Sequence, residues 1–178
     1  MQTLSVVMSR PAVELAASYM QFIDELRTHG DRIWEGLVPR AGEGAPDFVA
    51  RLVRAETSAN PPWVATTTYW ATISGAVVGR GALRHELTQD LAEFGGHIGY
   101  EVRPSFRRQG VATEMLRQIL LTDEARRIGR LLLTCAPTNT ASNKTIQANG
   151  GKLARTGFVE RIGRNTNYYW IDLSAGRP

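Results

Sequence analysis

A run of basic residues around one glycine has the composition of an anion-binding loop. It reads Arg107-Arg108-Gln109-Gly110-Val111-Ala112 and lies between a strand-like and a helix-like segment. The first turn of a helix leaves backbone N–H groups unpaired at the positive end of the helix dipole, which suits a pyrophosphate or a similar anion. A glycine also lets the backbone approach such a ligand closely. The alternative interpretation is a basic loop ahead of an ordinary helix.

Other chemical motifs are incomplete in this sequence. It has no Gly-x-x-x-x-Gly-Lys loop, and Gly79-Arg80-Gly81 is followed by Arg84 where a dinucleotide-binding fingerprint requires glycine. His85-Glu86 begins like a zinc-binding helix motif but lacks the second histidine, so we expect no metal. The Gly-x-Ser-x-Gly turn of serine hydrolases does not occur in the sequence either.

The first half of the chain predicts two helices followed by a β-hairpin. The helices follow from apolar residues at helical spacing, and the hairpin from β-branched and aromatic residues around a Ser-Gly turn. The expected elements are a helix over 12–29, a second helix capped by Asp47 and stopped by Asn60-Pro61-Pro62, and strands over 64–73 and 76–84 joined at Ser74-Gly75.

The second half predicts strands alternating with helices. Its long helix carries two adjacent apolar rows, and the run that follows is apolar throughout, as in a strand buried on both faces. The expected elements are a strand over 97–103, a helix over 109–127, a strand over 130–135, a helix of about ten residues closed by Asn149-Gly150-Gly151, and an antiparallel pair over 158–162 and 168–173. This order predicts one mixed α/β (α+β) domain over residues 1–178, with its core at about 12–173.

The composition excludes several classes of protein. Of 178 residues, 43% are hydrophobic, and 21 basic against 17 acidic residues give a net charge of +4. This excess is smaller than a dedicated nucleic-acid-binding protein usually carries, so we expect no nucleic-acid partner. The single cysteine, Cys135, excludes an internal disulfide and suits a reducing compartment. No apolar run approaches the roughly 20 residues of a membrane span, and the N-terminus lacks a basic leader, so a cytoplasmic protein is expected.

Residues 107–112 resemble the Arg/Gln-x-x-Gly-x-Gly/Ala motif of the GNAT acetyltransferases, in which this loop holds the pyrophosphate of acetyl-CoA. The resemblance extends to residues 96–104, which are similar to the fourth strand of that family. It also includes Asn139-Thr140-Ala141-Ser142-Asn143-Lys144, similar to the second cofactor motif. The resemblance covers most of the chain. The sequence also resembles an uncharacterised bacterial branch of predicted acetyltransferases.

The resemblance implies a GNAT-like fold, in which the fourth and fifth strands run parallel and splay apart around the pantetheine arm of acetyl-CoA. The cofactor-binding residues that it implies are Tyr100, Val102, Arg107, Arg108, Gln109, Gly110, Val111, Ala112, Asn139, Ser142 and Asn143. Backbone N–H groups near Val102 would face the thioester carbonyl. A donor aimed at the developing oxyanion stabilises the tetrahedral intermediate by roughly 3–4 kcal/mol in known cases.

The resemblance also implies an N-acetyltransferase, in which a primary amine of a small molecule or peptide attacks the thioester directly. An amine with a reference pKa of about 10.4 is mostly charged at neutral pH, so a base or a water chain must remove its proton. The candidates are Glu101, His97 and His85, the last beside Glu86. Strand alternation places His97 and Glu101 on one face, unless a bulge shifts the parity. For His97 the alternative is a packed core or loop histidine.

One position departs from the family pattern. Many GNAT members have a tyrosine seven residues after the asparagine of the second motif, as the acid that protonates the leaving thiolate, and here that position is Ile146. Ser142 could take this role, or a tyrosine from elsewhere in the chain (Tyr100, Tyr168 or Tyr169), or the thiolate could leave with the help of solvent. The alternative role of Ser142 is to cap its helix. The departure keeps a second hypothesis open, a catalytically silent CoA-binding or regulatory module.

The acceptor is expected to bind between the N-terminal helices, the connection before the fourth strand and the last hairpin. These segments include residues 30–62 and 86–95, and they carry no motif that identifies the acceptor. Most aromatic residues are interpreted as packing residues of the core and sheet, and some are expected to line this pocket. The arginines at 126–130 and 155–164 are interpreted as solvated faces. Relatives are often dimers, so a homodimer is a further expectation.

Overall fold

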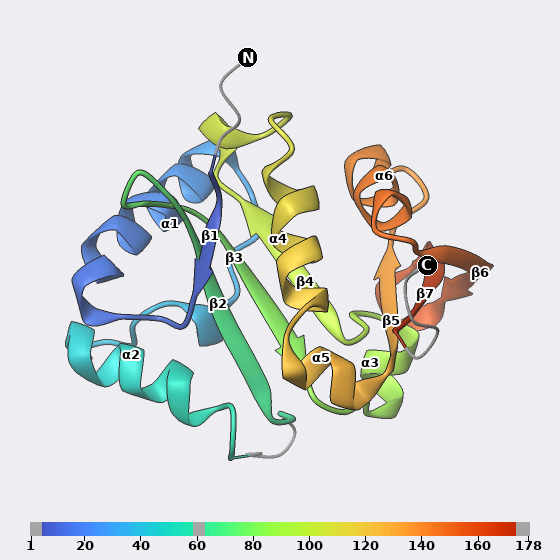
Figure 1. Cartoon of the computed structure of the whole chain (residues 1–178), viewed down its shortest axis with the longest axis horizontal. Coiled ribbons are helices and arrows are strands. Elements are labelled where there is room, and N and C mark those ends of the chain that lie inside the picture. Colours follow the sequence, from blue (N-terminus) through green and yellow to red (C-terminus); the bar gives the residue numbers. More distant parts are fainter. Residues whose placement is uncertain (1–4, 59–62, 174–178) are drawn as a thin grey trace.

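The computed structural model describes residues 5–58 and 63–173, and their strands form two antiparallel sheets (Figure 1). The first sheet has the strand order β1-β2-β3-β4 and the second has the order β5-β7-β6. The strands are β1 (Val7–Ser9), β2 (Thr66–Ile73), β3 (Ala76–Arg84), β4 (Ile98–Val102), β5 (Arg130–Cys135), β6 (Lys152–Val159) and β7 (Arg164–Asp172). Each sheet therefore comes from its own half of the chain.

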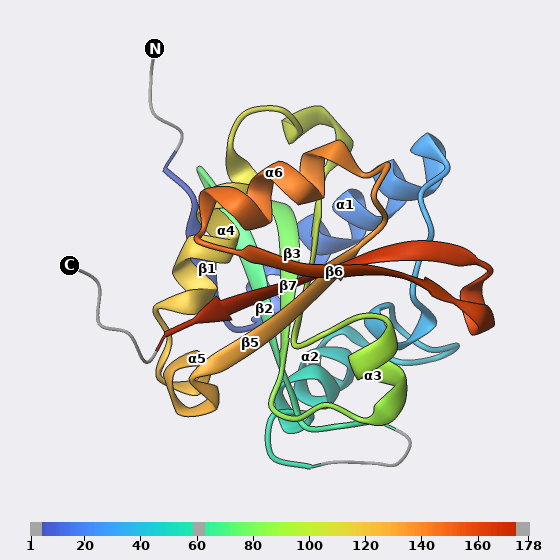
Figure 2. The same cartoon turned by 90° about the vertical axis from the view of Figure 1, so that its right-hand side faces the viewer.

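Helices cover both faces of the first sheet. Those on one face are α1 (Ala16–His29) and α2 (Ala45–Arg54), and α4 (Val111–Leu120) lies on the other face (Figure 1). The remaining helices are α3 (Gln89–Glu93), α5 (Asp123–Ile128) and α6 (Thr140–Ala148), and short 3₁₀ turns lie at Val13–Leu15, Glu35–Leu37, Pro104–Phe106 and Glu160–Ile162. Figure 2 shows the second sheet in front, with α6 above it and α3 below.

Aromatic side chains fill the core between the first sheet and the helices α1 and α2. Tyr19 stacks on Trp70 with ring centroids 4.3 Å apart, and Phe48 lies against both rings. On the opposite face of the sheet, Met115 and Ile119 of α4 are fully buried over β3. The interpretation of Trp70 as a packing residue and the predicted apolar face of α4 are therefore confirmed.

Backbone hydrogen bonding links the two sheets at the start of β4. The backbone N–H of His97 donates to the carbonyl of Leu132 in β5 over 2.7 Å. Gly96, with φ at +64°, lies so close to this strand that a Cβ would stand 2.4 Å from the Leu132 carbonyl oxygen. Beyond this junction β4 and β5 point toward the same end of the molecule and diverge (Figure 1). The predicted splay of the two central strands is thus present.

Most of the predicted elements are confirmed. The hairpin at Ser74-Gly75, the strand over 130–135 and the helix after Asn139 have the expected places. The predicted single helix over 109–127 is wrong, because it breaks after Leu121, where the Thr122 side chain accepts a hydrogen bond from Ala125 N–H and starts α5.

The other differences concern element boundaries. Asp47 lies inside the first turn of α2 rather than capping it, and the N-cap is Gly44. The last hairpin turns at residues 160–163, so the predicted link through 163–167 is wrong. The first strand of this hairpin starts at Lys152, earlier than predicted. The sequence analysis did not find β1 or α3. The predicted helix stop at 60–62 lies outside the described residues.

Candidate functional site

The loop between β4 and α4 is anchored to the end of α1 by ion pairs. Glu25 accepts hydrogen bonds from Arg103 Nε over 2.5 Å and from the Ser105 N–H over 2.6 Å. These contacts, with desolvation opposing them, lower the pKa of Glu25. Arg107 donates to the Val102 carbonyl and to Asp31. The loop is therefore held in one conformation, and the Arg107 guanidinium is occupied by protein partners.

The tip of this loop presents an uncapped helix start. Gly110 is the N-cap of α4 with φ at +80°, no side chain caps the helix, and a Cβ at Gly110 would meet nothing within 4 Å. Arg108, beside it, also has a positive φ of +61° and is exposed. The N–H groups of the first turn therefore face open space next to an exposed guanidinium, as an anion site requires.

The backbone of β4 directs alternate polar groups into the gap between the sheets. The Arg84 N–H donates to the His97 carbonyl and the Arg103 N–H donates to the Val78 carbonyl, so the odd-numbered residues of β4 pair with β3. Tyr100 and Val102 consequently direct their N–H and C=O groups away from β3, toward the gap. The ladder with β3 shows no bulge, so the expected parity of His97 and Glu101 holds.

The far wall of the gap is the start of α6. Asn139 is its N-cap and accepts a hydrogen bond from the Ser142 N–H over 3.0 Å. The Ser142 hydroxyl is therefore free of capping and lies 3.0 Å from the Tyr100 hydroxyl of β4. Burial raises the pKa of Tyr100 to about 12, against a smaller lowering by Ser142. A pair of protonated hydroxyls thus joins the two walls.

Asn143 is occupied by the protein itself. Its side-chain oxygen lies within hydrogen-bonding distance of the Cys135 thiol, the Asn167 amide and the Tyr169 hydroxyl, the last at 2.6 Å. Its amide nitrogen donates to carbonyls of the loop between β5 and α6. The residue holds that loop against β7 and has little bonding capacity left for a ligand.

Burial raises the pKa of the Cys135 thiol, which suits a buried packing residue.

Glu101 lies on the face of β4 that looks toward α1. Its carboxylate accepts a hydrogen bond from Arg80 Nε over 2.5 Å, and Arg80 also donates to the Tyr19 hydroxyl over 2.8 Å. Arg80 is buried at 3% exposure, whereas the Glu101 side chain is 28% exposed. Arg80 was not predicted as a functional residue, although a charged side chain within the predicted strand over 76–84 was a usable signal.

The two histidine candidates have different surroundings. The Leu132 N–H donates to His97 Nδ1 over 2.9 Å, so this lone pair is already used and the ring is neutral with its proton on Nε2. Burial, and then the charge of Arg84, lower the pKa of His97 to about 4. His85 bonds to Thr67 and follows the end of β3 that pairs with the start of β4, away from the loop at Gly110.

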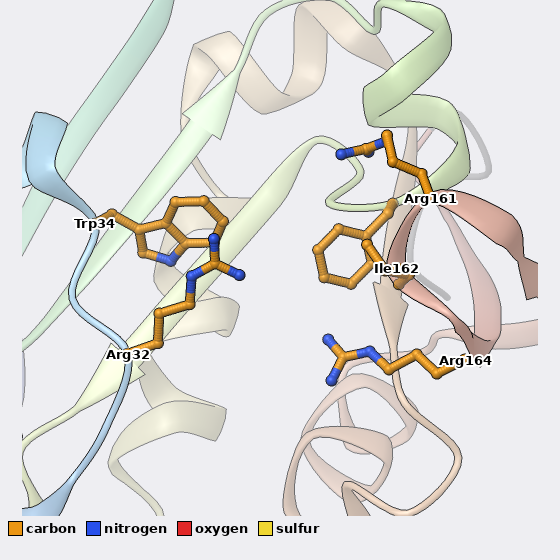
Figure 3. Close-up of a pocket in the computed structure, with 6 residues that line it drawn as sticks. Arg32, Trp34, Arg161, Ile162 and Arg164 are labelled. Carbon is orange, nitrogen blue, oxygen red and sulfur yellow. The ribbon is translucent and has the colours of Figure 1, made fainter.

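A second hollow lies between the chain after α1 and the turn of the last hairpin (Figure 3). It has a volume of about 450 Å³ and is lined by Arg32, Trp34, Phe94, Arg161, Ile162 and Arg164. These residues come from the three segments in which the acceptor pocket was expected. Arg161 and Arg164, interpreted from the sequence as a solvated face, are exposed, and they also line this hollow.

The described residues contain no group of three or more His, Cys, Asp or Glu side chains placed to hold a metal ion. None of the helices in the same part of the chain has both the length and the apolar character needed to cross a membrane.

Comparison with known proteins places these features in a family. Residues 31–150 match the model of the acetyltransferase (GNAT) family. No curated protein matches the chain. The similar solved structures include RimJ from Mycobacterium smegmatis in complex with CoA-disulfide, which has a TM-score of 0.66, is 20% identical and covers 97% of this chain and 84% of its own.

Two further structures are similar over nearly the whole chain. The Microcin C7 self-immunity acetyltransferase MccE, in complex with acetyl-CoA and AMP, has a TM-score of 0.65 at 14% identity, over 94% of this chain and 92% of its own. The aminoglycoside acetyltransferase AAC(6')-Ib, in complex with coenzyme A, has a TM-score of 0.61 at 14% identity, over 96% of both chains. At these identities the likeness shows the fold, and it confirms the fold predicted from the sequence.

Proposed function

Because the chain belongs to the GNAT acetyltransferase family, we propose that it transfers the acetyl group of acetyl-CoA to a primary amine by direct attack of the amine on the thioester. The observation that carries the proposal is the gap between β4 and β5 with an uncapped helix start at its mouth. RimJ, MccE and AAC(6')-Ib, which share the fold, were solved with CoA-disulfide, acetyl-CoA or coenzyme A.

The proposed cofactor site uses main-chain donors more than side chains. The N–H groups at the start of α4 would bind the pyrophosphate, with Gly110 giving access and Arg108 adding charge. Arg107 would act indirectly, by holding the loop to Asp31 and Val102. The N–H groups of Tyr100 and Val102 would bind the pantetheine and the thioester oxygen, where charge develops as the amine attacks.

We assign to Glu101 the role of the base that removes the proton of the attacking amine, either directly or through a water molecule. Of the three predicted bases, His97 has its Nδ1 lone pair engaged by Leu132 and His85 lies at the other end of the strand pair. Glu101 is partly exposed, and the ion pair with Arg80 holds its carboxylate in place. When the amine nitrogen bonds to the carbonyl carbon, its proton passes toward this carboxylate or to water.

We assign the protonation of the leaving thiolate to the pair of hydroxyls formed by Tyr100 and Ser142. Collapse of the tetrahedral intermediate breaks the C–S bond, and the CoA sulfur takes a proton from this pair. Ile146, at the position of the usual tyrosine, is 1% exposed and packs in the core, so it cannot serve. The silent-module hypothesis rested on that substitution. The Tyr100–Ser142 pair weakens it, because a protonated hydroxyl lies at the gap.

A panel of amines with purified protein tests the proposal. Calorimetry with acetyl-CoA measures cofactor binding, and mass spectrometry measures acetylation of peptides, polyamines, amino acids and aminoglycosides. Binding together with acetylation of at least one amine supports the enzyme. Binding without turnover of any amine supports the silent module, and absence of both binding and turnover contradicts the cofactor site itself.

The finer expectations on partners stay proposals. An amine on a small molecule or a peptide is the proposed acceptor class, and a cytoplasmic location and a homodimer remain predictions from the sequence. The free, buried Cys135 is compatible with a reducing compartment.

A further inference from the structure

The hollow between the chain after α1 and the last hairpin has two facing walls (Figure 3). Arg32 and Trp34 form one wall, and Arg161, Ile162 and Arg164 form the other. Phe94, which lines the hollow as well, lies four residues before β4. The volume of about 450 Å³ falls within the range of small-molecule sites, roughly 300–1,000 Å³.

The charge of this hollow is of one sign. Its lining includes three arginines and no acidic side chain. Several other arginines of the described residues pair with carboxylates, as Arg51 does with Glu43 and Arg103 with Glu25. None of the ion pairs found in the described part of the chain includes an arginine of this hollow.

The aromatic rings of the hollow are exposed to a ligand. Trp34 is 42% exposed, and the Arg32 guanidinium lies 4.2 Å from the centre of its ring system. Arg164 stands 5.3 Å from the centre of the Phe94 ring. Each ring is thus next to a cation, and a flat group entering the hollow can stack on a ring while an attached anion meets a guanidinium.

We propose that this hollow binds an acceptor amine that also carries a flat ring and a phosphate or carboxylate group. The inference rests on the proposed function, because it assigns the acceptor side of the same reaction. Arginine forks bind phosphates and carboxylates through two parallel hydrogen bonds, which gives orientation as well as affinity. The same charges repel polyamines and aminoglycosides, so polycationic amines are excluded as the preferred acceptors.

Matched pairs of amines test the anion requirement. Pyridoxamine 5′-phosphate and pyridoxamine differ by a phosphate, and tyrosine and tyramine differ by a carboxylate, while spermidine represents polycations. With saturating acetyl-CoA, we expect kcat/KM for the anion-bearing member of at least one pair to exceed that of the member without the anion about tenfold or more. The phosphate pair and the carboxylate pair together identify which anion the site takes. Equal or higher kcat/KM for both members that lack the anion, or for spermidine, would overturn the proposal.

Charge reversals in the lining locate the effect. Arg161→Glu and Arg164→Glu should each lower kcat/KM for the preferred anion-bearing amine about tenfold, and they should leave kcat/KM for its partner without the anion within about twofold. Arg126→Glu is the matched control, because this arginine is exposed on α5 and its substitution changes the net charge by the same amount. A loss of the same size in the control, or no loss in the two hairpin variants, would contradict the assignment.

Direct binding separates this inference from the proposed function. Calorimetry with the same four ring amines is done with coenzyme A already saturating, so that the phosphate probe cannot occupy the cofactor loop. Anion-dependent binding that Arg161→Glu abolishes supports the hollow even if no amine is acetylated. If amines are acetylated but neither their binding nor their rate depends on the anion, the proposed acetyltransferase activity is supported and only the proposed acceptor class is overturned.

Discussion

Tyr100 contributes both its backbone and its side chain to the same gap. Strand pairing leaves its N–H and C=O free of β3, and its hydroxyl reaches Ser142 across from β4 to α6. Burial holds its pKa at about 12, so the phenol stays protonated throughout the range in which enzymes are assayed. In the proposed reaction this single residue would therefore combine a main-chain donor for the thioester with an acid for the sulfur.

Removing the phenol should slow the departure of the thiolate. We expect Tyr100→Phe to lower kcat about 100-fold, the smaller end of the usual effect of a general acid, with little change in the affinity for acetyl-CoA. Steady-state kinetics and calorimetry measure the two quantities. If Ser142 works through Tyr100, the Tyr100→Phe/Ser142→Ala double variant is no slower than Tyr100→Phe alone. Full activity in Tyr100→Phe would contradict the assignment.

Replacing the proposed base should change the pH dependence of the reaction. Glu101→Gln should lower kcat/KM near neutral pH about 100-fold. The deficit should shrink as the pH rises toward 10, because the free amine then forms without a protein base. A rate loss that is the same at every pH would indicate a structural effect of leaving Arg80 unpaired. Thermal denaturation of the variant measures that effect separately.

At this scale the sequence identified candidates but could not distinguish their roles. Strand alternation correctly placed His97 and Glu101 on one face, yet their chemistry depends on Leu132 and Arg80, residues 35 and 21 positions away in the chain. Such partners are set by how the sheets pack. The spacing of residues along one strand contains no information about them.

The start of α4 is the element on which the proposed cofactor binding depends. Gly110→Asp should weaken coenzyme A binding about 100-fold or more, because it places a carboxylate where the pyrophosphate would lie. Gly110→Ala is the matched variant, since it adds only the strain of a side chain at φ +80°, of about 1 kcal/mol, in otherwise open space. Calorimetry should therefore show a small loss for alanine and a large one for aspartate. Equal affinities of the two variants would remove this loop from the cofactor site.

Element boundaries were predictable where local chemistry determines them. The turn at Ser74-Gly75 adopts positive φ at both residues, which a Ser-Gly pair can supply. The break after Leu121 was missed, although Thr122 followed by Asp123 and Glu124 is a helix-start signal at which the apolar rows of α4 end. The three-residue strand β1 pairs with β2, 65 positions away at Val7 and Thr72, and no local pattern predicts it.

At the scale of the whole molecule, His97 forms a hydrogen-bonded link between the two sheets. His97 stays neutral in the folded chain with a pKa of about 4, whereas an unfolded histidine titrates near 6.5. Between these values the unfolded chain binds the extra proton, so stability falls as the pH falls from about 6.5 to about 4.

Replacing this histidine should flatten that pH dependence. We expect His97→Gln to have a lower Tm than the wild type at pH 7 and a smaller further drop between about pH 6.5 and pH 5. His85→Gln is the matched control, the same substitution at a histidine outside the junction. Parallel Tm profiles for the wild type and His97→Gln would show that the junction does not titrate in this way.

The separation of the sheets along the sequence has a consequence for how the chain folds. Strands β2, β3 and β4 form a meander of neighbouring pairs, and β5, β6 and β7 pair within residues 130–172. Short-range pairings form sooner than long-range ones. We therefore expect two nascent halves that acquire protected amides independently, and pulse-labelling during refolding should find the contact between residues 96–97 and Leu132 protected last. In that event the catalytic gap is the final part of the molecule to mature, and early protection there would refute the expected order.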